Sequence, residues 1–202
     1  MGLRTRSQSF RTSDGRSVTL RPLAPRDAPA LVGFANAMAE EKKVNRDLGV
    51  VSFDRRATTA EEKRFLSETL KGMKRKETVS VAAFDGNRLV GHCDIRRRMR
   101  DDVMHAGTLG ITVLDGYRGV GLGEKLMSEA LLRAWRRGIR LVQLTVFSNN
   151  SVARALYGKM GFREVGVIPG KVVRDGKPLD EVIMYAEFRR TDKSTPRPRQ
   201  KS

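Results

Sequence analysis

Three glycines at alternate positions, Gly119, Gly121 and Gly123, stand directly before a run of helix-forming residues. Glycine destabilises a helix interior, but it lets the backbone approach a ligand closely or take conformations that other residues avoid. With Arg118 these glycines make an R-x-x-G-x-G pattern, in which several backbone N–H groups at the positive end of a helix can converge on one anion. The stretch therefore predicts an anion-binding turn, and a tight turn without a ligand is the alternative.

Two other phosphate-binding patterns fit this stretch poorly. A Walker loop needs Gly-Lys-Ser/Thr, but here Glu124 separates Gly123 from Lys125, and Leu126 follows. A dinucleotide fingerprint needs G-x-G-x-x-G, and the third glycine position after Gly119 and Gly121 is occupied by Glu124. The shorter R-x-x-G-x-G pattern therefore remains the better description of the turn.

The elements that would position this turn follow from hydrophobic periodicity and from turn and capping residues. We expect a strand, two helices, three strands, a helix, a strand, a helix and two strands. Thr59 and Glu62 have the spacing of a capping box at the start of the second helix. Strand 108–114, helix 124–137 and strand 139–147 should form a right-handed crossover. The predicted fold class is α/β of the α+β type: a mixed, mostly antiparallel sheet with helices on both faces.

The charge of the chain is large and concentrated at its ends. The 202 residues carry a formal net charge of +17. Residues 1–16 hold four Arg and one Asp, and residues 189–202 hold six Lys or Arg and one Asp. We expect flexible basic tails over 1–16 and 189–202, flanking one domain over 17–188. Such a field attracts anionic partners. Solubility or loose electrostatic attraction is the first interpretation of the tails, and contact with a polyanion is the alternative.

Composition excludes several other classes of site. The single cysteine, Cys93, allows neither an internal disulfide nor a cysteine-based metal cluster, and the sequence gives no reason to expect a metal. A lone cysteine suits a reducing compartment, so a cytoplasmic location is expected. No apolar run approaches the about 18 residues that span a membrane, so no membrane partner is expected.

A second stretch, NSVARALYGKMGF at 150–162, follows the next predicted strand. Together, YRGVGLG and N-x-x-A-x-x-L-Y-x-x-x-G-F resemble the GCN5-related N-acetyltransferase (GNAT) superfamily, and their separation by one helix and one strand fits as well. The resemblance covers residues 17–188. It implies a GNAT fold whose central sheet has a V-shaped splay, acetyl-CoA as co-substrate, and transfer of its acetyl group to a primary amine.

The same resemblance implies a role for each matching residue. The pyrophosphate of acetyl-CoA should lie on the backbone from Arg118 through Gly119, Val120, Gly121 and Leu122 to Gly123. The pantetheine arm should run along Ile111, Thr112 and Val113, with the Val113 N–H stabilising the oxyanion. Asn150 and Ala153 should contact the arm, although Asn150 could also be an ordinary helix N-cap. Tyr157 should protonate the departing thiolate as general acid.

The general base is the open question. Many relatives place a glutamate where this chain has Thr108, and threonine cannot accept a proton as a carboxylate does. By strand alternation, His92 and Asp94 share one face of the preceding strand. Asp94 is therefore the candidate for carrying the proton away, with a structural role as the alternative. His105 lies near a loop, where a solvated role is expected.

The acceptor amine is not specified by any motif. Our first expectation is a protein lysine or N-terminus, on an acidic or nucleic-acid-bound target. A small-molecule amine is the second, and a non-catalytic CoA-binding protein on the same fold is the third. A strongly cationic protein should be a poor host for polyamines unless it contains a local acidic pocket. Substrate selection should reside in residues 24–75 and 165–188.

Overall fold

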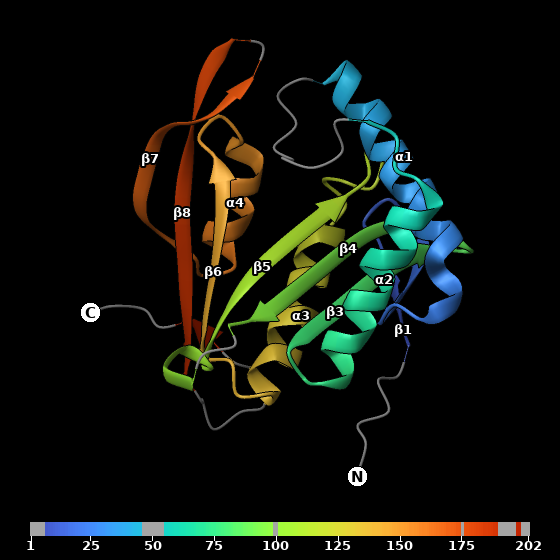
Figure 1. Ribbon diagram of the computed structural model, residues 1–202, viewed down its shortest axis with the longest axis horizontal. Helices are drawn as coiled ribbons and strands as arrows, with labels where there is room; N and C mark the ends of the chain where they lie inside the picture. The colour runs from blue at the N-terminus through green and yellow to red at the C-terminus, as the bar shows by residue number, and fades with distance from the viewer. Residues whose placement is uncertain (1–6, 46–54, 99–100, 175, 190–196, 199–202) are drawn as a thin grey trace.

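One sheet runs through the molecule, and its strand order is β1-β2-β3-β4-β5-β6-β8-β7, with β9 paired to β8. The computed structural model describes residues 7–45, 55–98, 101–174, 176–189 and 197–198. Figure 1 shows α1 and α2 on one side of β3 and β4, and α3 on the other. The strands are β1 (Gln8–Arg11), β2 (Ser17–Arg21), β3 (Thr78–Asp85), β4 (Arg88–Arg97), β5 (Ala106–Val113), β6 (Leu141–Phe147), β7 (Arg163–Arg174), β8 (Lys177–Arg189) and β9 (Arg197–Pro198). The helices are α1 (Ala28–Val44), α2 (Thr59–Lys74), α3 (Leu122–Arg136) and α4 (Ser151–Lys159), with short 3₁₀ turns η1 (Pro25–Asp27) and η2 (Asp101–Val103).

The predicted fold class is confirmed, because every strand pair of this sheet is antiparallel except β5 with β6. The hairpin between β3 and β4 turns through Gly86 and Asn87, and Gly86 has a φ of +56°. Strand β3 is buried along almost its whole length, since helices cover both of its faces. Strand β3 pairs with β4, and β4 pairs with β5, so β5 is held at the edge of this buried part of the sheet.

The parallel pair of β5 and β6 is short. Ala106, Gly107 and Thr108 pair with residues 141–143, and no further residue of β5 pairs with β6. Beyond this point β5 continues beside β4 as far as Val113, and β6 continues beside β8 as far as Phe147. The two strands therefore diverge, which is the V-shaped splay that the family resemblance implies. Gly107 sits at the junction, where a Cβ atom would lie 2.9 Å from the Ile95 side chain.

Helix α2 begins one residue earlier than the capping box predicted from Thr59 and Glu62. Thr58 is the N-cap: its hydroxyl accepts the Glu61 N–H at 3.3 Å, and the Glu61 carboxylate accepts the Thr58 N–H at 2.8 Å. Both threonine–glutamate pairs have the right spacing, so spacing alone could not choose between them. The shift leaves Glu62 outside the cap.

The N-terminal tail predicted over 1–16 is wrong for residues 8–16. Strand β1 pairs with β2 along its four residues, and Thr12, only 3% exposed, closes the turn between them. The Ser13 N–H donates to the Val120 carbonyl at 3.2 Å, and the Arg16 guanidinium lies 4.0 Å from the centre of the Tyr117 ring. These contacts with a distant segment, invisible in a polar and Arg-rich sequence, order the segment.

The C-terminal tail predicted over 189–202 is wrong for its three described residues, which all lie in strands. Strand β8 extends to Arg189, and Arg197–Pro198 pair with its end. Residues 1–6, 190–196 and 199–202 of the predicted tails lie outside the described residues.

An ion pair fixes the start of α1 to β2. The Asp27 carboxylate, 4% exposed, accepts hydrogen bonds from the Arg21 guanidinium at 2.6 and 2.7 Å and from the Ala24 N–H at 2.7 Å. Burial alone would raise the pKa of Asp27, but the hydrogen bonds from Arg21 and Ala24 outweigh it and lower the pKa below 3.8. The ionised form is therefore the one that stabilises the fold.

Asp27→Asn is expected to lower the free energy of unfolding at pH 7 by about 2–3 kcal/mol, because it leaves a half-buried guanidinium without its counter-charge. The depressed pKa makes this contribution complete above the unfolded pKa and progressively lost as the pH falls through the folded value. Chemical denaturation at pH 7 and pH 3 should show the difference between variant and wild type shrinking at the lower pH. Glu68→Gln, an exposed change on α2, is the control; a difference independent of pH would contradict the assignment.

Candidate active site

A cavity of about 620 Å³ lies where β5 and β6 part. The end of β5, the glycine turn, β6 and the first turns of α4 supply most of its walls. It is lined by most of the residues predicted to hold the cofactor: Ile111, Thr112, Val113, Arg118, Gly119, Gly121, Gly123, Asn150, Ala153 and Tyr157. Val120 and Leu122 belong to the same turn, but their side chains pack against or into the core. Residues far apart in the sequence are thus gathered around one cleft.

The glycine turn leads into α3 with the geometry of an anion site. Gly119 and Gly121 have φ of +71° and +83°, in the left-handed region that favours glycine. Gly121 is the N-cap of α3, and the first helical hydrogen bond runs from the Lys125 N–H to the Gly121 carbonyl at 3.1 Å. The N–H groups of residues 122–124 therefore have no acceptor within the helix, and they point out of its positive end.

The Arg118 side chain anchors the turn to the protein. Its Nε donates to the Val113 carbonyl at 2.8 Å, and its guanidinium pairs with Glu41 of α1. Glu41 also accepts the Asp115 N–H at 2.7 Å. Arg118 therefore positions the turn through its side chain, which leaves its backbone for an anion. Sequence reasoning missed Glu41, because an acidic residue in the middle of a helix belongs to no local motif.

The backbone of β5 offers unpaired groups to the cleft. The Leu114 N–H donates to the Val90 carbonyl on β4 at 3.0 Å. Successive residues of a strand direct their N–H groups to opposite edges, so the N–H groups of Val113 and Ile111 point away from β4, towards the cleft. β6 does not pair with either residue. An extended ligand could take the hydrogen bonds that β6 leaves unmade.

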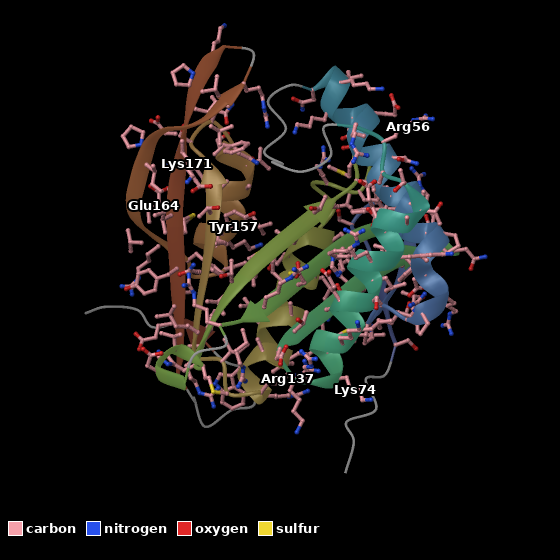
Figure 2. All side chains as sticks on the ribbon, viewed as in Figure 1. Arg56, Lys74, Arg137, Tyr157, Glu164 and Lys171 are labelled. Carbon is pink, nitrogen blue, oxygen red and sulfur yellow. The ribbon has the colours of Figure 1, made fainter. Side chains whose placement is uncertain are left out.

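Tyr157 of α4, labelled in Figure 2, lines the cavity although its side chain is only 8% exposed. Its ring packs against Phe162, with 6.2 Å between ring centres. Burial, with a smaller contribution from Cys93, raises the pKa of Tyr157 to about 12. The phenol is therefore protonated at neutral pH, as a proton donor must be. Its hydroxyl makes no hydrogen bond within the described part of the chain.

Asn150 occupies the N-cap of α4, where its side-chain oxygen accepts the Ala153 N–H at 3.1 Å. This is the ordinary structural role considered from the sequence. Since Asn150 also lines the cavity, contact of its remaining amide group with a pantetheine arm stays a prediction.

A second cavity, of about 610 Å³, lies between the sheet and the helices α1 and α2. Ile111 and Thr112 line both cavities, so the two meet at β5. The ionisable residues of its lining are Arg55, Glu61, Glu62, His92 and Asp94, and apolar residues such as Phe34 and Phe65 complete it. Sequence reasoning missed Arg55, Glu61 and Glu62 as site residues, because tertiary packing alone brings α2 over β4.

His92 and Asp94 lie on one face of β4, as predicted, and both face the second cavity. His92 is buried; its Nε2 lies 2.9 Å from the Ser80 hydroxyl, and burial lowers its pKa, so it is neutral at pH 7. Asp94 accepts a hydrogen bond from the Arg96 Nε at 2.7 Å. Thr108 and His105 are exposed and line neither cavity.

Over the described ranges, no group of three or more His, Cys, Asp or Glu side chains could hold a metal ion. None of the helices described is both long and apolar enough to cross a membrane.

A family model described as the acetyltransferase (GNAT) family matches residues 46–162, more than half of the chain. The chain belongs to the GNAT family. A solved GNAT acetyltransferase from Streptococcus pneumoniae is 30% identical, with a TM-score of 0.74 over 84% of this chain and 99% of that one. The shared architecture confirms the GNAT fold that the sequence resemblance implies.

Two curated GNAT relatives match shorter segments. The L-amino acid N-acetyltransferase AaaT of Escherichia coli is 33% identical over 106 residues, 52% of this chain and 64% of that protein. The N-alpha-acetyltransferase RimI of Mycobacterium tuberculosis is 38% identical over 87 residues, 43% of this chain and 53% of that protein. The chain thus spans between half and two thirds of the length of these relatives.

Gly123→Ala is expected to weaken acetyl-CoA binding about tenfold or more. A Cβ atom at Gly123 would lie 3.2 Å from the Leu156 side chain, which lines the cavity and would be pushed into it. Isothermal titration calorimetry measures the affinity. Gly158→Ala, on α4, is the matched control, because its added Cβ meets nothing within 4 Å. Wild-type affinity in a folded Gly123→Ala variant would contradict the site.

Gly121→Val is expected to reduce both acetyl-CoA binding and stability, unlike Gly123→Ala. Because Gly121 has a φ of +83°, a β-branched residue there should lower stability by about 1–2 kcal/mol in addition to weakening binding. Thermal denaturation separates the two effects, since Gly123 carries no positive φ.

Proposed function

We propose that the protein transfers the acetyl group of acetyl-CoA to a primary amine. The observation that carries the proposal is the cleft between β5 and β6, with an anion-binding helix end at its mouth and a buried phenol in its wall. Membership of the GNAT family supports the same reaction.

The residues present fit acetyl-CoA. The pyrophosphate would lie on the N–H groups at the start of α3, where the positive φ of Gly119 and Gly121 lets the backbone turn around an anion. The pantetheine arm would take the hydrogen bonds offered by Ile111 and Val113 in place of β6. The thioester would then reach the stretch of β5 that lines both cavities, so that an amine in the second cavity can approach it.

In the proposed reaction the amine nitrogen attacks the thioester carbon and forms a C–N bond. The Val113 N–H stabilises the negative charge that develops on the carbonyl oxygen. The C–S bond then breaks, the nitrogen loses its extra proton, and Tyr157 donates its proton to the sulfur and recovers one from solvent.

The acceptor class has two candidates. AaaT and RimI carry the names of an amino-acid and a protein N-acetyltransferase, so the relatives support either. The second cavity, of about 610 Å³, has the size of a small-molecule site. It could equally take the end of a side chain or an N-terminus. A protein amine on a polyanionic target remains our proposal for a chain of charge +17, in the cytoplasm, with a small-molecule amine as the second candidate.

Tyr157→Phe is expected to lower kcat about 10²-fold or more, the usual range for losing a general acid, with little change in acetyl-CoA affinity. Thiol release from acetyl-CoA with a panel of amines measures the rate, and calorimetry measures the affinity. Thr108→Ala is the control, because it removes no ionisable group and lines neither cavity. An equal loss in both variants would overturn the role of Tyr157. A wild type that binds CoA and acetylates no amine would instead support a non-catalytic CoA-binding protein.

A further inference from the structure

The second cavity is acidic although the chain is strongly basic. Among the described residues that line it are three carboxylates, Glu61, Glu62 and Asp94, and one guanidinium, Arg55. The chain as a whole has a net charge of +17. A negative lining attracts cations and repels anions, and its effect is strongest where low-dielectric walls surround the charges. Because Arg55 pairs with Glu61 and Arg96 pairs with Asp94, the unpaired charge of the described lining is negative and comes from Glu62, which favours a cationic amine.

Two of the three carboxylates are already engaged by the protein. Glu61 pairs with Arg55 and caps α2 at Thr58, and the hydrogen bonds from Arg55 and Thr58 lower its pKa to about 2. Asp94 is paired with Arg96. The hydrogen bonds that lower the pKa of Glu61 make it a poor proton acceptor, and the Asp94 carboxylate is already committed to its ion pair.

Glu62 differs from Glu61 and Asp94 in having no partner for its carboxylate among the described residues. It makes no ion pair or hydrogen bond with another side chain in the part of the chain that the structure describes. Its side chain is half-buried, and it lies one helical turn before Phe65, whose ring meets the edge of His92 on β4 at 6.0 Å between centres. Glu62 therefore belongs to the face of α2 that looks onto β4 and the cavity.

The surroundings of Glu62 favour the protonated form of its carboxyl group. Burial raises the pKa of its carboxyl, and the neighbouring charge of Glu61 raises it further. From β4, His92 is neutral and Asp94 is neutralised by Arg96, while Arg55 is neutralised by Glu61. The part of α1 in the cavity wall contributes only the apolar residues Leu31, Phe34 and Ala35, and β5 contributes uncharged residues. The free carboxylate most suited to accept a proton in this cavity is thus Glu62.

We propose that the second cavity binds a cationic amine and that Glu62 accepts the proton which its ammonium group must lose before attack. The inference rests on the proposed function. It replaces Asp94, the base considered from the sequence, by a residue on α2, and it names the acceptor class as an alkyl ammonium ion.

The proton balance is simple. The ammonium group enters as R–NH₃⁺ and gives one proton to the Glu62 carboxylate, which passes it to solvent through the open cavity. The neutral amine attacks the thioester, and the nitrogen loses its second proton as the C–S bond breaks. The sulfur gains one proton through Tyr157, so each turnover releases one proton to solvent.

The test compares wild type, Glu62→Gln and Glu62→Asp as full-length chains with saturating acetyl-CoA. The acceptor probes are spermidine, putrescine and benzylamine, which are cations at pH 7, and aniline, which is neutral. Thiol release gives kcat/KM as a function of pH. Glu62→Gln should lower kcat/KM for the cationic probes about 10²-fold at pH 7, with the deficit shrinking at alkaline pH as free amine becomes available. Glu62→Asp should recover part of the rate, because it keeps a carboxylate.

Glu68→Gln, an exposed change on the same helix that lines neither cavity, should behave as wild type. Calorimetric binding of spermidine, without acetyl-CoA, should weaken in Glu62→Gln and not in Glu68→Gln. Equal pH profiles for wild type and Glu62→Gln would refute the role of Glu62, and a wild-type preference for aniline would refute the acceptor class. No thiol release by wild type with any amine would refute the proposed function itself.

Discussion

The site depends on the separation of two parallel strands after three paired residues. Beyond Thr108, β5 stays bonded to β4 and β6 stays bonded to β8, so the facing edges of β5 and β6 have no strand partner. Unpaired backbone groups inside a protein are unfavourable unless a side chain or ligand satisfies them. Arg118 satisfies the Val113 carbonyl, and the N–H groups of Ile111 and Val113 remain for an extended ligand. The glycine turn follows the end of β5 and α4 follows the end of β6, so the divergence also places the anion site and Tyr157 on the same cleft.

The molecule has to meet two opposite electrostatic demands. A polyanionic co-substrate needs a positive site, which the N–H groups at the start of α3 provide. The cationic acceptor that we propose needs a negative site, and Glu62 is the carboxylate without an ion pair among the described residues that line the second cavity, in a chain of charge +17. Among the described residues, Ile111 and Thr112 of β5 are the ones that line both cavities. In the proposed reaction the anionic co-substrate and the cationic amine therefore reach β5 from separate cavities.

The features that sequence predicted correctly are those that depend on neighbouring residues. The start of α3 directly after the glycine turn and the N-cap at Asn150 follow from residue type and spacing, and the splay came from the family resemblance. The features that were wrong or missed depend on contacts between distant segments. Strand β1 is ordered by β2 and by Val120; Glu41 meets Arg118 across 77 positions; and Glu62 reaches its cavity only because α2 packs over β4. Local spacing also failed to choose between Thr58 and Thr59 as the cap of α2, and this choice decides which glutamate is free.

The crystal structure of the protein in complex with acetyl-CoA tests the central claim most directly, because the claim is that the diverging strands form the slot for the co-substrate. We predict the pyrophosphate on the backbone of residues 119–124, the pantetheine arm hydrogen-bonded to Ile111 and Val113, and the thioester beside Thr112, facing the second cavity. Acetyl-CoA bound elsewhere, or bound with its thioester turned away from the second cavity, would contradict the account.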